Sequence, residues 1–214
     1  MTVDIPLTTK KTIYLIRHGQ TEYNIRQVVQ GRGVNSDLNE TGRQQAKMFF
    51  DAYKHIPFDV VYTSALKRTN QTVQHFLALG IPNIQLPNLD EIDWGIFEGV
   101  EHNPSLQGTY HTIISHWRNG DLHIKIEGGE SAYDLFERIS PFIDEIKNTK
   151  HQTILACTHG RTLRMLMCLF SGKDITLMDD YEHHNLCLYK LNYDGTSFHI
   201  ELENDISHLE FENA

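Results

Sequence analysis

Three short apolar runs, each followed by a helical pattern, constrain the fold of this chain more than any other feature. They lie at residues 12–16, 59–63 and 153–157. Short apolar runs bounded by polar residues or glycine are typical of strands buried on both faces of a parallel sheet. Strands that alternate with helices predict an α/β fold, in which a mostly parallel sheet carries helices on both faces in three layers.

The segments between these runs have the periodicity of helices. Apolar residues recur at i, i+3, i+4 and i+7 from Ala46 to Tyr53, and residues 41–44 fit a capping box at the start of that helix. A second amphipathic pattern precedes the third run and contains Pro141. This proline either kinks one helix or starts a new helix with Ser140 as its cap.

The remaining segments complete the expected architecture. Residues 185–191 and 197–203 flank an Asp194-Gly195 turn, which predicts a hairpin. Residues 99–128 have a weaker pattern and are interpreted as a helical insertion over the sheet. A length of 214 residues suits one large domain, so we expect a single domain spanning residues 1–214.

Charge and composition exclude several classes of protein. The 19 basic and 28 acidic residues give a net charge of −9, which disfavours nucleic acid and anionic membranes as partners. The longest apolar stretches fall far short of the roughly 20 residues that cross a bilayer. Three cysteines without a CxxC pair indicate reduced thiols, and no secretory signal is visible at the start, so the expected location is the cytoplasm.

Basic and histidine side chains follow the three predicted strands. Arg17 and His18 end the first run, Arg68 lies shortly after the second, and His159 follows the third. Ligands of such sheets bind at the carboxyl ends of the strands, so these side chains are candidates for one common site. Four cationic groups in one place would repel each other, and a phosphate group relieves that repulsion while matching the arginine geometry.

A histidine in such surroundings is a candidate nucleophile. Nearby cations disfavour protonation of an imidazole, and a neutral imidazole can attack phosphorus to form a phosphohistidine. The leaving oxygen then needs a proton donor. Asp90, Glu91 and Asp93 are all candidates, and physical reasoning alone does not choose among them.

The segment beginning Arg17-His18-Gly19 resembles the RHG signature of the histidine phosphatase superfamily, which has the phosphoglycerate-mutase-like fold. Further segments match the family's pattern in order, at residues 38–42, 63–68, 91–99, 128–131 and 158–160. Only 28 residues separate Gly99 from Gly128, and this spacing resembles the compact phosphatase branch, whereas classical mutases have a longer insertion there.

The resemblance implies a role for each matching residue. It makes His18 the phosphorylated nucleophile and Glu91 the acid–base carboxylate. Acid-phosphatase-like branches take their proton donor directly after the second histidine, where this chain has Gly160, and this favours Glu91. The residues implied to bind phosphate or the rest of the substrate are Arg17, Asn24, Gln30, Gly31, Arg68, His159 and Gly160.

The resulting expectation is a phosphomonoesterase that hydrolyses a small phosphorylated metabolite and needs neither a cofactor nor a metal. A cofactor-dependent phosphoglycerate-type mutase is the alternative, and a binding module without catalysis is a third. The other histidines lack metal-binding spacing and are interpreted as surface or loop residues; they are His102, His111, His116, His183 and His184. Trp94 and Trp117 belong either to the core or to the pocket.

Overall fold

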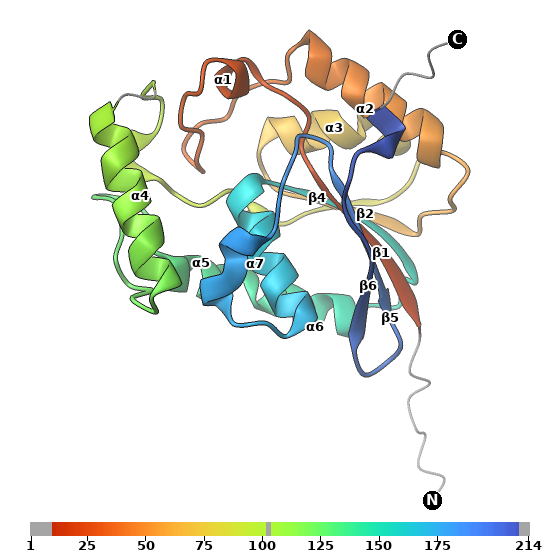
Figure 1. The fold of residues 1–214 in the computed structure, drawn as a ribbon. Helices are drawn as coiled ribbons and strands as arrows, with labels where there is room; N and C mark the ends of the chain where they lie inside the picture. Colours follow the sequence, from red (N-terminus) through yellow and green to blue (C-terminus); the bar gives the residue numbers. More distant parts are fainter. Residues whose placement is uncertain (1–9, 102–103, 210–214) are drawn as a thin grey trace, which may run out of the picture.

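The computed structural model describes residues 10–101 and 104–209, so His102 lies outside the described residues (Figure 1). One sheet of six strands has the order β3-β2-β4-β1-β5-β6. Its strands are β1 (Lys11–Arg17), β2 (Val60–Thr63), β3 (Asn83–Gln85), β4 (Thr153–Thr158), β5 (Leu188–Tyr193) and β6 (Phe198–Asp205). The first four are mutually parallel, and β5 and β6 are antiparallel to their neighbours. The α/β fold expected from the sequence is confirmed, including the hairpin.

Helices cover both faces of this sheet, as Figure 1 shows. The helices of the described residues are α1 (Glu22–Ile25), α2 (Glu40–Tyr53), α3 (Lys67–Leu77), α4 (Pro104–Arg118), α5 (Ala132–Ile139), α6 (Pro141–Asn148) and α7 (Gly160–Ser171). Helices α2 and α3 pack on one face, and α5, α6 and α7 pack on the other. Short 3₁₀ helices lie at Pro87–Leu89, Gly95–Phe97, Ile175–Asp180 and Ser207–Leu209.

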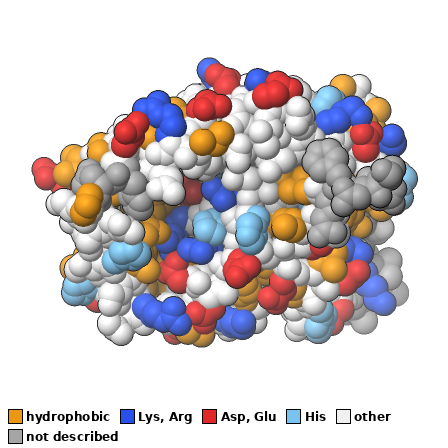
Figure 2. All heavy atoms as spheres, turned by 45° about the horizontal axis from the view of Figure 1, so that its top comes forward, with side chains coloured by type: hydrophobic (Ala, Val, Ile, Leu, Met, Phe, Trp, Pro, Cys, Tyr) orange, Lys and Arg blue, Asp and Glu red, His pale blue; other side chains and the backbone are white. Residues whose placement is uncertain are grey.

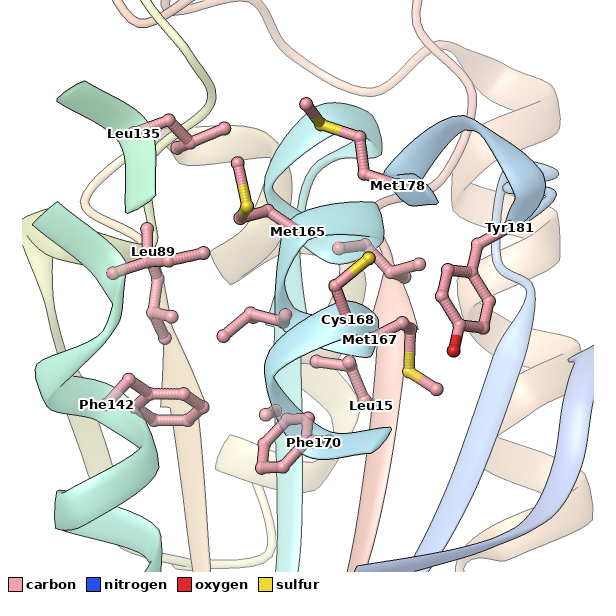
Figure 3. Packing of buried hydrophobic residues seen from close by; sticks show 14 of the residues in the cluster. Leu15, Leu89, Leu135, Phe142, Met165, Met167, Cys168, Phe170, Met178 and Tyr181 are labelled. Carbon is pink, nitrogen blue, oxygen red and sulfur yellow. The ribbon is translucent and has the colours of Figure 1, made fainter. Parts of the chain in front are cut away.

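Strand β1 shows why the apolar run is continuous. Ile13 and Leu15 belong to the cluster beneath α7, whereas Tyr14 and Ile16 belong to the cluster beneath α2 and α3. Successive side chains point to opposite faces, so a strand covered on both sides must be apolar at every position. Figure 3 shows Leu15 beside the α7 side chains, including Met167.

The structure corrects the predicted start of α2 and decides between the two interpretations of Pro141. The predicted capping box at residues 41–44 is wrong: α2 begins at Glu40, and the side chain of Asn39 accepts a hydrogen bond from the Gly42 N–H at 2.8 Å. Asparagine caps at least as well as threonine, and it stands earlier in the chain. Pro141 starts the separate helix α6, which was one of the two alternatives; Ser140 precedes it without a side-chain capping bond.

The expected insertion contains α4, which stands to one side of the sheet in Figure 1. Trp117 anchors this helix: it is 1% exposed, its Nε1 donates to the Ile124 carbonyl at 2.7 Å, and its ring stacks on Trp94 at 5.9 Å. Trp117 is therefore a core residue. Among the described residues, no helix combines the length and apolar character needed to span a bilayer.

Candidate active site

The carboxyl ends of the parallel strands bring the predicted site residues together. Strands β1 and β4 run side by side with Arg17 opposite Thr158, so His18 and His159 follow at the same edge, and their rings lie 5.2 Å apart. Arg68 enters from the first turn of α3, just beyond β2. Figure 2 shows basic and histidine side chains gathered in a hollow on this face.

His18 is held as a neutral imidazole with one free nitrogen. Its side chain is almost completely buried, and Nδ1 lies 2.7 Å from the Gly19 carbonyl oxygen. A carbonyl oxygen only accepts, so Nδ1 carries the proton and Nε2 keeps its lone pair. Burial, together with the charges of Arg68 and Arg17, holds the pKa of His18 well below its usual range.

Arg68 is completely buried, and each nitrogen of its guanidinium group donates a hydrogen bond. Nη1 donates to the Val34 carbonyl at 2.6 Å, Nη2 donates to the Gly31 carbonyl at 3.3 Å, and Nε donates to His159 Nδ1 at 3.1 Å. His159 is therefore protonated on Nε2, which donates to Ser64 Oγ at 2.8 Å. Burial lowers the pKa of Arg68 to about 10, so it remains charged at neutral pH.

Arg17 has an unused hydrogen-bond donor. Its Nη1 donates to the His183 carbonyl at 2.6 Å, but its Nε is buried and has no partner among the described residues. Buried hydrogen-bond donors are nearly always paired in proteins, so an unpaired buried N–H group at a cavity indicates a ligand-binding position. Because Arg17 lines the cavity, an anionic oxygen bound there would supply the missing acceptor.

The structure separates the three candidate carboxylates. Glu91 lines the cavity, whereas Asp90 accepts from the Ala65 N–H and pairs with Arg32, and Asp93 accepts from the Gly95 N–H. Glu91 is held against the start of α7: Oε2 accepts from the Arg161 N–H at 3.1 Å, and Oε1 accepts from the Thr162 N–H at 3.1 Å. These two hydrogen bonds fix the Glu91 side chain at the wall of the cavity.

Arg17 and Glu91 line a cavity of about 630 Å³, whereas His18, Arg68 and His159 are buried and are not among its lining residues. The lining residues are Arg17, Gln27, Val28, Val29, Gln30, Glu91, Trp94, Gln107, Tyr110, Gly160, Arg161 and His183. Gly160 leaves room that no other residue would leave, because a Cβ there would lie 2.5 Å from the His183 ring.

Two of the implied substrate contacts are placed differently. Asn24 is not among the lining residues, and its side-chain oxygen accepts from the Thr21 N–H and hydroxyl at 3.0 Å each, which caps α1. The Gly31 carbonyl holds Arg68, as described above. A Cβ on Gly31 would lie 1.8 Å from Glu98 Oε1 and 2.7 Å from the Ile92 carbonyl oxygen, so this position requires glycine.

His183 and Arg161 are lining residues that the sequence analysis missed. His183 was interpreted as a surface or loop residue, but it lines the cavity, and burial lowers its pKa to about 2. It precedes β5, whose first residue Leu188 pairs with Ile16 at the end of β1, so the antiparallel direction of β5 carries it to this edge. The only sequence signal for Arg161 was its place directly after Gly160.

Buried neutral histidines make the stability of this protein depend on pH. The pKa of His18 lies below its unfolded value of 6.5, so below pH 6.5 the unfolded chain binds a proton that the folded protein does not. The free energy of unfolding therefore falls as the pH drops, by up to about 1.4 kcal/mol per pH unit for each such histidine. Urea unfolding at pH 6 and pH 5 in phosphate-free buffer tests this. We expect the loss to be about 1.4 kcal/mol smaller in His18→Gln than in the wild type; equal losses would contradict it.

Among the described residues, no group of three or more histidine, cysteine, aspartate or glutamate side chains is placed to hold a metal ion. A reaction that needs no metal remains a prediction. The chemistry available at the site comes from two arginines, two neutral histidines and one carboxylate.

The α/β sheet and the cluster at its edge are those of an enzyme that acts on phosphate groups. The sequence profile of the histidine phosphatase superfamily (branch 1) matches residues 13–206, and the chain belongs to this superfamily.

Relatives of this chain include both phosphatases and mutases by name. A protein of Hydrogenobacter thermophilus provisionally named phosphoserine phosphatase 2 is 26% identical over 92% of this chain and 97% of its own. The 2,3-bisphosphoglycerate-dependent phosphoglycerate mutase of Bartonella bacilliformis is 31% identical over 87% of this chain and 95% of its own. Among solved structures, Bacillus stearothermophilus YhfR is 28% identical, with a TM-score of 0.81 over 94% of this chain and all of that one.

Proposed function

We propose that this protein is a phosphomonoesterase that hydrolyses a small phosphorylated metabolite through a phosphohistidine on His18. The observation that carries the proposal is the orientation of His18. Its Nδ1 is held by the Gly19 carbonyl, which leaves Nε2 as a nucleophile beside the charges of Arg17 and Arg68.

In the first step, Nε2 of His18 attacks phosphorus, so that an N–P bond forms while the ester P–O bond breaks. Arg17 donates to a phosphoryl oxygen through its unpartnered Nε, Arg68 stabilises the phosphoryl group through its positive charge, and His159 holds Arg68 in place. Glu91 in its protonated form gives its proton to the leaving oxygen, which departs as an alcohol. Gln30 and Gly160 contact the substrate from the cavity wall.

In the second step, water attacks the phosphorus of the phosphohistidine. Glu91, now a carboxylate, takes the proton from the water, and the N–P bond breaks. Inorganic phosphate leaves and His18 returns to its neutral form. Asn24 and Gly31 then act indirectly, the first by capping α1 and the second by holding Arg68.

A phosphoglycerate-type mutase is the second candidate, because the Bartonella bacilliformis relative carries that name. A mutase returns the phosphoryl group to a bound intermediate, whereas a phosphatase gives it to water. The Bartonella bacilliformis relative aligns over 95% of its own length, so the compact spacing of 28 residues between Gly99 and Gly128 does not distinguish the two candidates.

Two assays separate these candidates. We expect phosphate release from p-nitrophenyl phosphate in the presence of EDTA, at a rate that 2,3-bisphosphoglycerate does not increase. We also expect no appreciable interconversion of 2- and 3-phosphoglycerate. Rapid interconversion that depends on 2,3-bisphosphoglycerate would overturn the assignment, and so would loss of hydrolysis in EDTA that added metal restores.

A further inference from the structure

The cavity extends well beyond what a phosphate group requires. Its volume of about 630 Å³ is in the range of pockets that enclose drug-sized ligands. Part of the lining belongs to the proposed chemistry, through Arg17, Glu91 and Gly160. The remaining wall comes from residues 27–30, from Trp94 and from α4, and it faces whatever is attached to the phosphate.

Arg161 and His183 also belong to this remaining wall, which otherwise consists of neutral polar groups, flat rings and two valines. Three glutamines line it, at positions 27, 30 and 107, and the indole of Trp94 lies next to the phenol ring of Tyr110 with 5.2 Å between ring centroids. Amide groups suit hydroxyl, carbonyl or amide partners, and aromatic rings suit flat apolar ones. Neither supplies the positive charge that would compensate a carboxylate or a second phosphate.

Arg161 is the one cation in this part of the lining, and its charge is already engaged. Its Nη1 donates to Asp179 Oδ1 at 2.6 Å, and its Nη2 donates to the Tyr110 hydroxyl. The guanidinium carbon lies 5.8 to 5.9 Å from the ring centroids of Trp94, Tyr110 and Trp117. With two nitrogens bound and rings around it, Arg161 has little capacity left for an anion from the substrate.

Asp179 is well placed to keep Arg161 in this state. The same Oδ1 also accepts from Arg164 Nη1 at 2.8 Å, and Arg164 Nε in turn donates to the Tyr181 carbonyl at 2.8 Å. Asp179 therefore fixes the position of Arg161 and offsets part of the charge of the two guanidinium groups. The Asp179 side chain is only 14% exposed, so water screens the Arg161–Asp179 pair weakly.

We infer that the leaving group of the substrate is uncharged and flat, and that Asp179 disfavours anionic leaving groups by engaging the guanidinium group of Arg161 and offsetting part of its charge. This inference rests on the proposed phosphatase function and names its substrate class: phosphomonoesters of neutral aromatic or similarly flat alcohols. Phosphoglycerate and phosphoserine carry a carboxylate and fall outside that class.

The test uses two substrates of nearly equal shape, 4-carbamoylphenyl phosphate and 4-carboxyphenyl phosphate, which differ by one negative charge. We expect the wild type to have a kcat/KM at least about tenfold higher for the amide, and Asp179→Asn to bring the ratio of the two values close to one. Asp180→Asn is the matched control, because the neighbouring Asp180 pairs with the exposed Arg118 on the surface and we expect its ratio to equal that of the wild type. A ratio measured on one preparation does not depend on the fraction of folded protein.

Equal or better use of the carboxylate by the wild type would overturn the inference, as would an unchanged ratio in Asp179→Asn. The corresponding pair of phosphonates, which cannot be hydrolysed, gives the same comparison as a ratio of Kd values. An absence of turnover with both phosphates would refute the proposed function, while the phosphonate ratio would still decide the inference.

Discussion

Replacing His18 by alanine is expected to lower kcat for phosphomonoester hydrolysis by at least about 10³-fold. The nucleophile disappears, and no other described side chain has a free imidazole nitrogen between Arg17 and Arg68. The fold should tolerate the change, because the hydrogen bond of the His18 ring joins it to the neighbouring Gly19 carbonyl rather than to another element.

Trapping the intermediate checks the same prediction directly. After an alkaline detergent quench with labelled substrate, the wild type should carry phosphate that is stable to alkali and released by acid, and the His18→Ala protein should carry none. His55→Ala, which removes an exposed histidine, is the control and should behave like the wild type. Turnover of His18→Ala at the wild-type rate would remove His18 from the reaction.

Replacing Glu91 by glutamine is expected to produce a loss that depends on the leaving group. For an alkyl ester such as glycerol 3-phosphate, kcat/KM should fall by about 10²- to 10⁴-fold, because the departing alkoxide needs a proton. For p-nitrophenyl phosphate the loss should be much smaller, because p-nitrophenolate leaves readily without one. The parameter kcat/KM is the correct readout because it reports the steps up to formation of the phosphoenzyme.

Asp93→Asn is the control for the Glu91→Gln variant, and a loss of stability is a second expected effect of that variant. Asp93→Asn changes a nearby carboxylate that does not line the cavity, and we expect no dependence on the leaving group. Glutamine at position 91 would turn one N–H group toward the donors that Glu91 now binds, so we expect a stability loss of about 1–3 kcal/mol in urea unfolding. Equal losses of kcat/KM with both substrates would argue against Glu91 as the proton donor.

The parallel strands were predictable because a strand that is buried on both faces has a continuous run of apolar residues in the sequence. Every position of β4 from Ile154 to Thr158 is buried, so the apolar run is continuous. The edge strand β3 has no such run, since Asn83 and Gln85 are exposed. The capping error at α2 has a similar origin, because Asn39 and Thr41 are both good caps and only the backbone path chooses between them.

Local sequence patterns could not predict the contacts between segments that lie far apart in the chain. Arg68 and His159 are 91 residues apart, and only the neighbouring positions of β2 and β4 bring them within 3.1 Å. His183 lies at the cavity because β5 runs antiparallel to β1, and no short sequence motif predicts the direction of that strand. No short sequence pattern distinguishes Arg161 from any other helix residue. Its contact with the Tyr110 hydroxyl depends on the position of α4, which only the tertiary structure shows.

Sequence alone therefore determined the strand-and-helix order, the superfamily resemblance and the candidate nucleophile, because each depends on residues close together in the chain. Tertiary structure decided the protonated nitrogen of His18, the unpaired donor of Arg17, the carboxylate that faces the cavity and the hydrogen-bond partners of Arg161. These properties depend on burial and on hydrogen bonds between segments that meet only when the sheet forms, and so no local pattern records them.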